Sequence, residues 1–257
     1  MNLSIVIPAY RNLVDILTVL NSLQATATDF RAIQWIIQDD CSPEIDLRLL
    51  IPPYVASVDR NPVNVGFAAN CNRGAARATG DVIAFVNQDI IADGNLSRGW
   101  DATILAAFED ASVGIVAPRL VFPDGKVQSA GGVFDANCAP VHRCLGYSDL
   151  TNWEVNTPEP VQWITGAFLA IRRDILQQLG GFDERYIGGY FEDVSLCLKV
   201  RELGYKVWYE PRVSFVHKVG STGGSPHFYN NAQLFRKEWV LTNKIKPDLP
   251  VATVRYW

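Results

Sequence analysis

The apolar run Val82–Val86 constrains the fold of this chain more than any other segment. It follows the breaker pair Gly80-Asp81 and is followed directly by three polar residues. A continuous apolar run of this length predicts a strand that is buried on both faces, as in the parallel sheets of α/β proteins. The polar residues then lie at the carboxyl end of the strand, which is where open α/β sheets bind their ligands.

The polar triplet Asn87-Gln88-Asp89 ends in a carboxylate with three possible uses. Asp89 can hold a metal ion, hold a sugar hydroxyl, or cap the turn after the strand. Aspartate is common in turns because its side chain accepts hydrogen bonds from nearby backbone N–H groups. The local sequence does not decide among these alternatives.

Residues 1–117 alternate predicted strands and helices. Apolar runs at Leu3–Pro8, Ile33–Gln38 and Val113–Ala117 predict further strands. Such alternation is typical of a mostly parallel, Rossmann-like sheet with helices on both faces, so we predict an α/β fold. The other expected elements here are helices at residues 13–23, Phe67–Thr79 and Leu96–Phe108, and a short strand near Val55 and Val58.

The second half is less regular. A hairpin is predicted around the turn Pro123-Asp124-Gly125, with strands at Arg119–Phe122 and Lys126–Phe134. The segment Asp135–Pro160 is interpreted as an irregular loop that packs on, or covers, a site. The remaining expected elements are strands at Trp163–Ile171, Tyr205–Tyr209 and Val213–Val216, helices at Asp174–Leu179, Phe191–Leu203 and Asn230–Lys244, and a mobile Gly- and Ser-rich segment at Ser221–Pro226.

Composition excludes several classes of protein. A chain of 257 residues buries enough surface to fold without disulfides. Its five cysteines are scattered and include no C-x-x-C, which favours free thiols in a reducing cytoplasm. A net charge of −4 argues against general nucleic-acid binding. The first residues do not resemble a signal peptide, and no apolar stretch approaches the roughly 18 residues of a membrane-spanning helix.

Three common catalytic motifs are absent. The turn Pro8–Asn12 contains no glycine, so the dinucleotide-binding fingerprint is missing, and neither a P-loop nor a G-x-S-x-G nucleophile elbow occurs. The remaining candidates for a functional site are acids at the ends of predicted strands or at the start of a predicted helix, and one histidine after a predicted strand. They are Asp39-Asp40, Asp89, Glu192-Asp193 and His217. If the fold groups them, these oxygen and imidazole ligands suit Mg²⁺ or Mn²⁺ bound to a diphosphate.

Eight segments between about Leu3 and Ser221 together resemble family 2 glycosyltransferases, which have the GT-A fold. They are SIVIPAYRN, IIQDDCS, NVGFAANCNRGA, FVNQD, APRLVFPDGKVQSAGG, TGAFLAIRR, GGFDERYIGGYFEDVSLCLKVRELGYKVWYEP and HKVGS. The APRLVFPDGKVQSAGG segment is most similar to the bacterial rhamnosyltransferase-like branch. The resemblance implies transfer of a sugar from a nucleoside diphosphate to an acceptor hydroxyl, with inversion at the anomeric carbon.

The resemblance also assigns donor-side roles. Asp39 matches the carboxylate that accepts a hydrogen bond from the nucleotide base, Asp89 matches the last acid of the metal-binding DxD element, and His217 matches a further metal ligand. The first DxD position is Asn87 here, which leaves one negative charge fewer at the metal. The other donor-side residues are Pro8, Ala9 and Tyr10 along the nucleoside, Asn64, Gly66 and Asn70 along the nucleotide, and Gln88, which is also expected to bind the donor.

Asp193 matches the catalytic base, and Glu192 is expected on the acceptor side. Thr165, Gly166 and Ala167 are expected there too, because small residues permit close approach. Each role has a structural alternative. Glu192 and Asp193 can simply be first-turn acids favoured by the helix dipole, Asp39 can be a helix N-cap, and His217 can be a structural histidine.

A single domain is expected, with a nucleotide-sugar-binding half at 1–117, an acceptor half at 118–229 and a helical tail at 230–257. The PDG-Q segment favours dTDP-rhamnose as donor, and the resemblance favours a surface polysaccharide or lipid-linked glycan as acceptor. A sugar-phosphate nucleotidyltransferase and a non-catalytic glycan-binding module are the alternatives. The tail mixes Arg236, Lys237, Lys244, Lys246 and Arg255 with Trp239, Tyr256 and Trp257, which suits either an anionic membrane surface or, the favoured interpretation, a solvated helix face.

Overall fold

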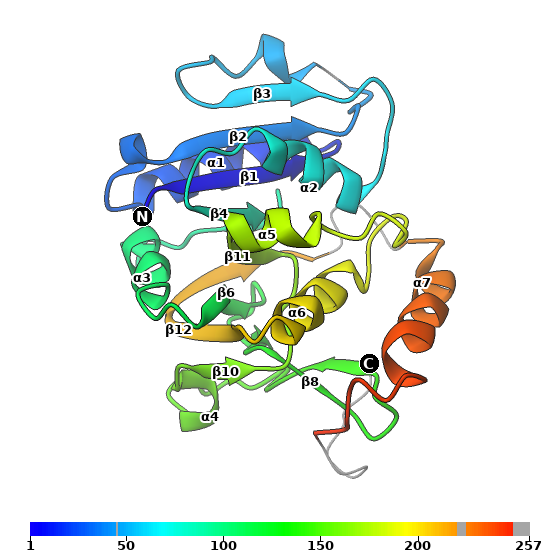
Figure 1. The fold of residues 1–257 in the computed structure, drawn as a ribbon. Helices are drawn as coiled ribbons and strands as arrows, with labels where there is room; N and C mark the ends of the chain where they lie inside the picture. The colour runs from blue at the N-terminus through cyan, green and yellow to red at the C-terminus, as the bar shows by residue number, and fades with distance from the viewer. Residues whose placement is uncertain (45, 220–224, 249–257) are drawn as a thin grey trace.

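The computed structural model describes residues 1–44, 46–219 and 225–248. In this part of the chain, ten strands form one mixed sheet that continues through both halves of the sequence (Figure 1). Eight of them follow the order β10-β12-β6-β11-β4-β1-β2-β3, while β5 pairs with β12 and β7 pairs with β6. The bounds are β1 (Leu3–Ala9), β2 (Gln34–Asp39), β3 (Ser57–Arg60), β4 (Val82–Val86), β5 (Ile90–Ile91), β6 (Val113–Val121), β7 (Val127–Ser129), β10 (Glu159–Val161), β11 (Phe168–Arg172) and β12 (Lys206–His217).

The parallel pairing expected of the first half is confirmed. β1 lies between β2 and β4 and is parallel to both, and β2 is parallel to β3. The carboxyl ends of these strands therefore meet at one edge of the sheet. β11 then runs antiparallel between β4 and β6, which makes the sheet mixed.

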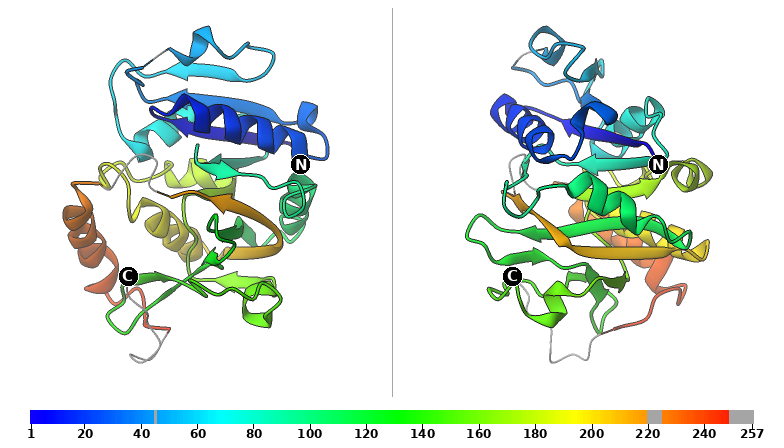
Figure 2. Two further views of the ribbon diagram at one scale, coloured as in Figure 1. Left: turned by 180° about the vertical axis from the view of Figure 1, so that it is seen from behind. Right: turned by 90° about the vertical axis from the view of Figure 1, so that its left-hand side faces the viewer.

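Helices cover both faces of the sheet (Figures 1 and 2). On one face α1 (Leu13–Thr26) and α3 (Trp100–Ala107) contribute to one apolar core. On the other face α2 (Phe67–Ala76), α5 (Arg173–Leu179), α6 (Glu192–Glu202) and α7 (Phe228–Phe235) contribute to a second core.

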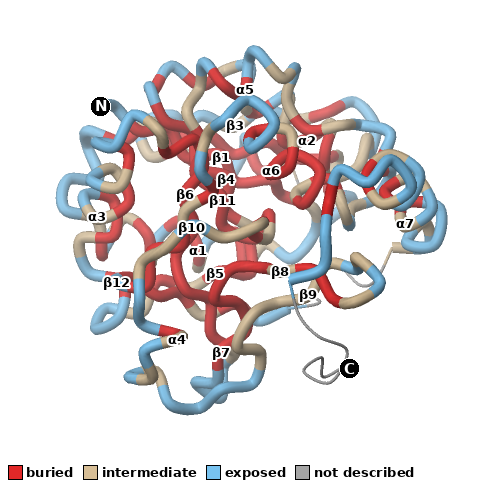
Figure 3. Tube along the Cα trace, turned by 60° about the horizontal axis from the view of Figure 1, so that its bottom comes forward, coloured by how far each residue is buried: buried red, intermediate tan, exposed pale blue. Residues whose placement is uncertain are grey.

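The strand β4 is buried on both faces, as its sequence predicts (Figure 3). Val82, Ala84 and Val86 belong to the first core, whereas Ile83 and Phe85 belong to the second. Because alternate side chains of a strand point to opposite faces, both faces of β4 need apolar residues. Full burial of each large side chain contributes about 1.5–3 kcal/mol, which explains the uninterrupted run.

Two strand predictions in the second half were wrong in their bounds. The two strands predicted at Tyr205–Tyr209 and Val213–Val216 are one strand, β12 (Lys206–His217), whose register shifts between Glu210 and Ser214, around Pro211. A bulge lets a strand bend past a residue that lacks a backbone donor, so the proline does not end it. In the predicted strand Trp163–Ile171, Trp163 forms an isolated antiparallel bridge to Gly132, and continuous pairing begins at Phe168. Trp163 is buried.

The predicted hairpin is present, since β6 and β7 pair antiparallel around Pro123-Asp124-Gly125. Its distal part instead forms β8 (Gly132–Phe134), which pairs with β9 (Pro140–His142) in a separate sheet. The expected irregular loop thus contains β9, the short helix α4 (Trp153–Asn156) and the start of β10. Within the predicted segment Ser221–Pro226, positions 221–224 lie outside the described residues.

The tail begins with α7 and continues as the π-helical turn η3 (Arg236–Val240). Trp239 is buried, and its Nε1 donates to Ser195 Oγ at 3.3 Å, so it is not a surface anchor. Lys244 and Lys246 are exposed, whereas residues 249–257 lie outside the described residues. Membrane contact through the tail stays a prediction. Among the described helices, none has both the length and the apolar character needed to cross a bilayer.

Candidate functional site

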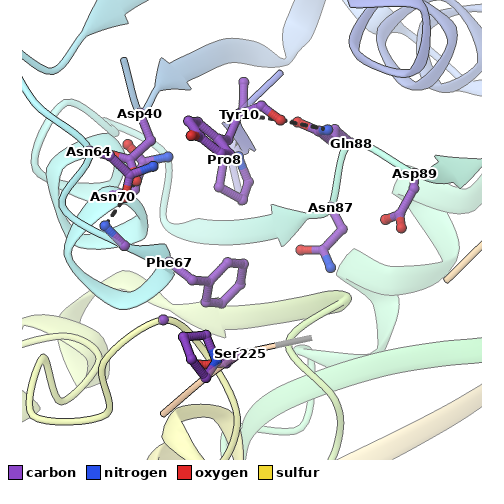
Figure 4. Close-up of a pocket in the computed structure, with 14 residues that line it drawn as sticks. Pro8, Tyr10, Asp40, Asn64, Phe67, Asn70, Asn87, Gln88, Asp89 and Ser225 are labelled. Atoms are coloured by element: carbon purple, nitrogen blue, oxygen red, sulfur yellow. Dashed lines mark hydrogen bonds between the residues drawn. The ribbon is translucent and has the colours of Figure 1, made fainter. Parts of the chain in front are cut away.

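A cavity of ≈ 250 Å³ lies at the carboxyl ends of β1, β2 and β4 (Figure 4). Asp40, Asn64 and Asn70 lie on one side of it, and Asn87 and Asp89 lie on the other. The predicted site residues on its wall are Pro8, Ala9, Tyr10, Asn64, Gly66, Asn70, Asn87, Gln88 and Asp89, and they are joined by Asp40, Phe67, Gly188, Ser225 and Pro226. The fold thus gathers predicted donor-side residues from three separate segments of the sequence.

Gln88 connects two sides of the cavity through its side-chain amide. Its Oε1 accepts from the backbone N–H of Tyr10 at 2.8 Å, and its Nε2 donates to the Tyr10 carbonyl at 3.1 Å. Gln88 is 4% exposed. This residue therefore holds the Pro8–Tyr10 loop beside the end of β4.

The two neighbouring acids at the end of β2 have different surroundings. Asp39 is fully buried, accepts from the backbone N–H and Oγ of Ser42, and forms an ion pair with Arg60 at 2.7 Å. It does not line the cavity. Asp40 does line it. The structure therefore assigns the cavity-facing position to Asp40, not to Asp39 as the sequence predicted, because successive side chains of a strand point in opposite directions.

Asp40 also shapes the loop before α2. Its carboxylate accepts from the backbone N–H groups of Val65 and Gly66, at 2.8 and 2.9 Å. Gly66 has φ +85°, and a Cβ atom there would lie 3.4 Å from the Gly188 nitrogen. A left-handed backbone and this close approach explain why glycine occupies position 66. Asn64 remains exposed on the cavity wall.

Asn70 is buried, and protein groups satisfy its amide. Its Nδ2 donates to the Gln38 carbonyl at 2.8 Å, and its Oδ1 accepts from Asn61 Nδ2 at 2.8 Å. Like Gln88, it therefore stabilises the cavity wall through protein contacts.

Asp89 and His217 meet at the edge of the cavity, with 3.2 Å between Asp89 Oδ1 and His217 Nε2. The antiparallel pairing of β5 with β12, in which Ile90 lies opposite His217, brings them together. No group of three or more His, Cys, Asp or Glu side chains suited to a metal occurs in the described part of the chain. A carboxylate and an imidazole nevertheless fit Mn²⁺, which takes its other ligands from water and phosphate oxygens.

Asp193 stands in the first turn of α6, beside the segment expected on the acceptor side. Its Oδ2 accepts from the Gly166 N–H at 2.7 Å, and its Oδ1 accepts from the Val194 N–H at 2.8 Å. The Ala167 carbonyl accepts in turn from the Asn87 N–H at 2.9 Å. The Gly166–Ala167 backbone thus connects the predicted base to the loop that carries Asn87 and Asp89, although Asp193 and His217 do not line the cavity itself.

Burial raises the pKa of both acids at the start of α6. Glu192 is 4% exposed, and its Oε2 is buried without a hydrogen-bond partner among the described residues. Loss of hydration is the main cause of its raised pKa, and the Asp193 charge adds to it. For Asp193, burial raises the pKa while backbone donors partly oppose it. A carboxylate with a raised pKa is a better proton acceptor near neutral pH.

Glu192→Gln is expected to raise the free energy of unfolding by about 1–3 kcal/mol at about pH 8, because it removes a buried charge that lacks a partner. The pKa of Glu192 is higher in the folded than in the unfolded protein. The charge therefore destabilises the fold only above the unfolded value of about 4.3, so the gain should disappear at about pH 4. Urea unfolding at both pH values tests this, with the exposed Glu109→Gln as control. An equal gain at both pH values would contradict the role of the charge.

Comparison with known proteins identifies the family. Residues 4–180 match the family model described as "Glycosyl transferase family 2", which is more than half of the chain.

The chain belongs to glycosyl transferase family 2.

Two curated relatives of this family 2 chain come from Mycobacterium tuberculosis. It is 30% identical over 223 residues to a pre-mycofactocin glycosyltransferase, covering 82% of this chain and 43% of the relative. It is also 30% identical over 182 residues to an N-acetylglucosaminyl-diphospho-decaprenol L-rhamnosyltransferase, covering 63% of this chain and 59% of the relative. The chain thus spans less than two thirds of the length of either protein.

A solved structure shows the GT-A fold expected from the resemblance. GalNAc-T7, determined with UDP, GalNAc and Mn²⁺, superposes with a TM-score of 0.73 at 18% identity, covering 94% of this chain and 50% of that one. The predicted fold class is therefore confirmed. The match to the family model ends at residue 180, so it does not include Asp193 or His217.

Sequence reasoning did not assign Phe67, Ser225 and Pro226 to the cavity wall. It also missed Asp40, Gly188 and Gln128. Asp40 was present in the quoted Asp-Asp pair, but nothing in the sequence indicated which acid faces the cavity. Gly188 lines the cavity at the point where its backbone lies close to Gly66. Gln128 contacts His217. It belongs to the APRLVFPDGKVQSAGG segment, so the resemblance of that segment to the family was the one sequence signal that could have indicated its role.

Proposed function

We propose that this family 2 chain transfers a sugar from a nucleoside diphosphate to an acceptor hydroxyl in a single, inverting displacement that needs a divalent cation. One observation carries the proposal. The Asp89–His217 pair lies at the edge of the cavity, and the Gly166–Ala167 backbone connects its loop to Asp193. A cation-binding pair and a carboxylate base are the two groups that such a displacement requires.

In this proposal, residues 1–117 bind the donor. The Pro8–Tyr10 loop and the Asn64–Gly66 segment lie along the nucleotide, and Asp40 provides the acceptor oxygens on that wall. Asp89 and His217 hold the cation. When bound, the cation would stabilise the charge that develops on the leaving diphosphate.

Residues 118–229 build the acceptor side of the same domain. Asp193 accepts the proton of the acceptor hydroxyl as the hydroxyl oxygen attacks the anomeric carbon. The bond from that carbon to the diphosphate oxygen breaks on the opposite face, and the nucleoside diphosphate leaves. One base is sufficient for this reaction, and no enzyme nucleophile is needed. Thr165 and Glu192 lie beside this base and contribute to the acceptor side.

We further propose dTDP-rhamnose as the donor and a polysaccharide or lipid-linked glycan as the acceptor. The PDG-Q segment supports this choice, as does similarity to a relative whose name describes rhamnosyl transfer to a diphospho-decaprenol-linked sugar.

A thermal-shift screen tests the donor. We expect dTDP and dTDP-rhamnose to raise Tm in the presence of Mn²⁺, because a ligand that binds only the folded state stabilises it. UDP-GlcNAc and GDP-mannose serve as matched donors with other bases and sugars. A larger shift with either of these would contradict the dTDP-rhamnose assignment, and no shift with any nucleotide would contradict the donor site.

A further inference from the structure

Gln128 lies behind His217, on the side away from Asp89. Its Oε1 is 2.8 Å from His217 Nδ1, whereas Asp89 Oδ1 is 3.2 Å from His217 Nε2. Gln128 and His217 are each 8% exposed, and Gln128 does not line the cavity. Both ring nitrogens of the histidine therefore have a defined neighbour, and only one of these neighbours belongs to the predicted donor site.

The chemistry of Gln128 selects one form of the His217 ring. An amide oxygen accepts hydrogen bonds and cannot donate them, so the contact requires a proton on Nδ1. In a neutral ring the lone pair is then on Nε2 and points toward Asp89 Oδ1. Two acceptor atoms 3.2 Å apart attract each other only when a cation or a proton lies between them. Gln128 thus presents the ring in the form that a metal ion needs.

A bulge in the β6–β7 hairpin aims the Gln128 side chain. Leu120 pairs with Ser129 and Val121 pairs with Val127, so Gln128 is an extra residue between two paired positions. β12 pairs with the opposite edge of β6 at the same level, where Val216 lies opposite Val121. β-Bulges near active sites commonly redirect a side chain. Here the bulge directs Gln128 to the histidine that follows Val216.

We propose that Gln128 is a positioning residue that fixes the tautomer and ring orientation of His217 for binding a divalent cation. The inference rests on the proposed cation dependence of the transfer reaction. It also gives a physical role to the glutamine of the PDG-Q segment. Mutation of a residue that hydrogen-bonds a metal-binding histidine typically lowers metal affinity by about 10- to 100-fold.

The next residue on the strand supplies a matched control. Ser129 is buried in the same short strand, and its Oγ lies 3.1 Å from Nδ1 of another histidine, His142, which packs against Trp163. Ser129→Ala removes a buried contact to a histidine and leaves the Gln128–His217 contact in place. It therefore separates an effect on His217 from general damage to the hairpin.

The test measures Mn²⁺ affinity by titration calorimetry with dTDP at saturation. Gln128→Met keeps the side-chain length and removes the acceptor, so we expect Mn²⁺ binding to weaken by about 10- to 100-fold. Gln128→Glu keeps the acceptor and should retain wild-type affinity or exceed it, and Ser129→Ala should not change it. Binding of dTDP in EDTA should be the same for all four proteins.

Two results would overturn the inference while leaving the proposed function intact: wild-type Mn²⁺ affinity in Gln128→Met, or equal weakening in Ser129→Ala. If the wild-type protein binds no Mn²⁺, the proposed cation dependence fails, and the inference fails with it. A second measurement applies even if Gln128→Met does not fold. The ¹⁵N spectrum of neutral His217 in the metal-free wild-type protein should show the proton on Nδ1, and a proton on Nε2 would overturn the inference.

Discussion

Asp193→Asn is expected to lower kcat for sugar transfer by about 10²–10⁴-fold, the usual contribution of a general base. The amide has nearly the same shape as the carboxylate but cannot accept a proton from the acceptor hydroxyl. Donor binding should be unchanged, because Asp193 does not line the cavity and contacts the Gly166 and Val194 N–H groups. The measurement is initial-rate kinetics with saturating donor, together with dTDP binding and Tm for the same variant.

Asp174→Asn is a suitable control for this prediction. Asp174 is also a first-turn acid, in α5, and its Oδ1 accepts from the next backbone N–H at 2.8 Å, as Asp193 does from Val194. If both acids only stabilise helix ends, the two variants should lose a similar, small amount of stability and no activity. Near-wild-type turnover in Asp193→Asn would remove Asp193 from the mechanism.

Asp89→Ala is expected to abolish Mn²⁺-dependent binding of the nucleoside diphosphate. Loss of a residue that only hydrogen-bonds a metal ligand typically lowers metal affinity by roughly 10- to 100-fold, and the loss in Asp89→Ala should be larger. The reason is that only His217 would remain of the proposed protein ligands, with its Nε2 facing the emptied position. Calorimetry with dTDP, in Mn²⁺ and again in EDTA, measures the effect. In EDTA the variant and the wild-type protein should bind dTDP equally.

The turn interpretation of Asp89 predicts a different outcome. Asp93, four residues further on, is a turn carboxylate that accepts from the Asn95 N–H at 2.8 Å. Asp93→Ala should therefore alter stability slightly and leave Mn²⁺-dependent binding intact. If Asp89→Ala behaves like Asp93→Ala, the role of Asp89 is structural.

Local patterns predicted the central strands and the position of the site. An interior strand needs apolar residues on both faces, so Val82–Val86 is recognisable without its neighbours. The polar residues after it then have to lie at the ligand-binding edge, and Asn87, Gln88 and Asp89 do line the cavity. Local patterns were less successful for β12, which was predicted as two strands although it continues past Pro211.

The alternating α/β architecture, the family and most of the cavity wall were therefore predictable from the sequence, because they depend on local apolar patterns and on the spacing of motifs. The tertiary structure decided which atoms face one another. At the end of β2, neighbouring side chains point to opposite sides, so Asp40 faces the cavity and Asp39 pairs with Arg60. A one-residue bulge aims Gln128 at His217, which is 89 positions away. Such contacts depend on the register between distant strands, and a shift of one residue would turn each side chain to the other face.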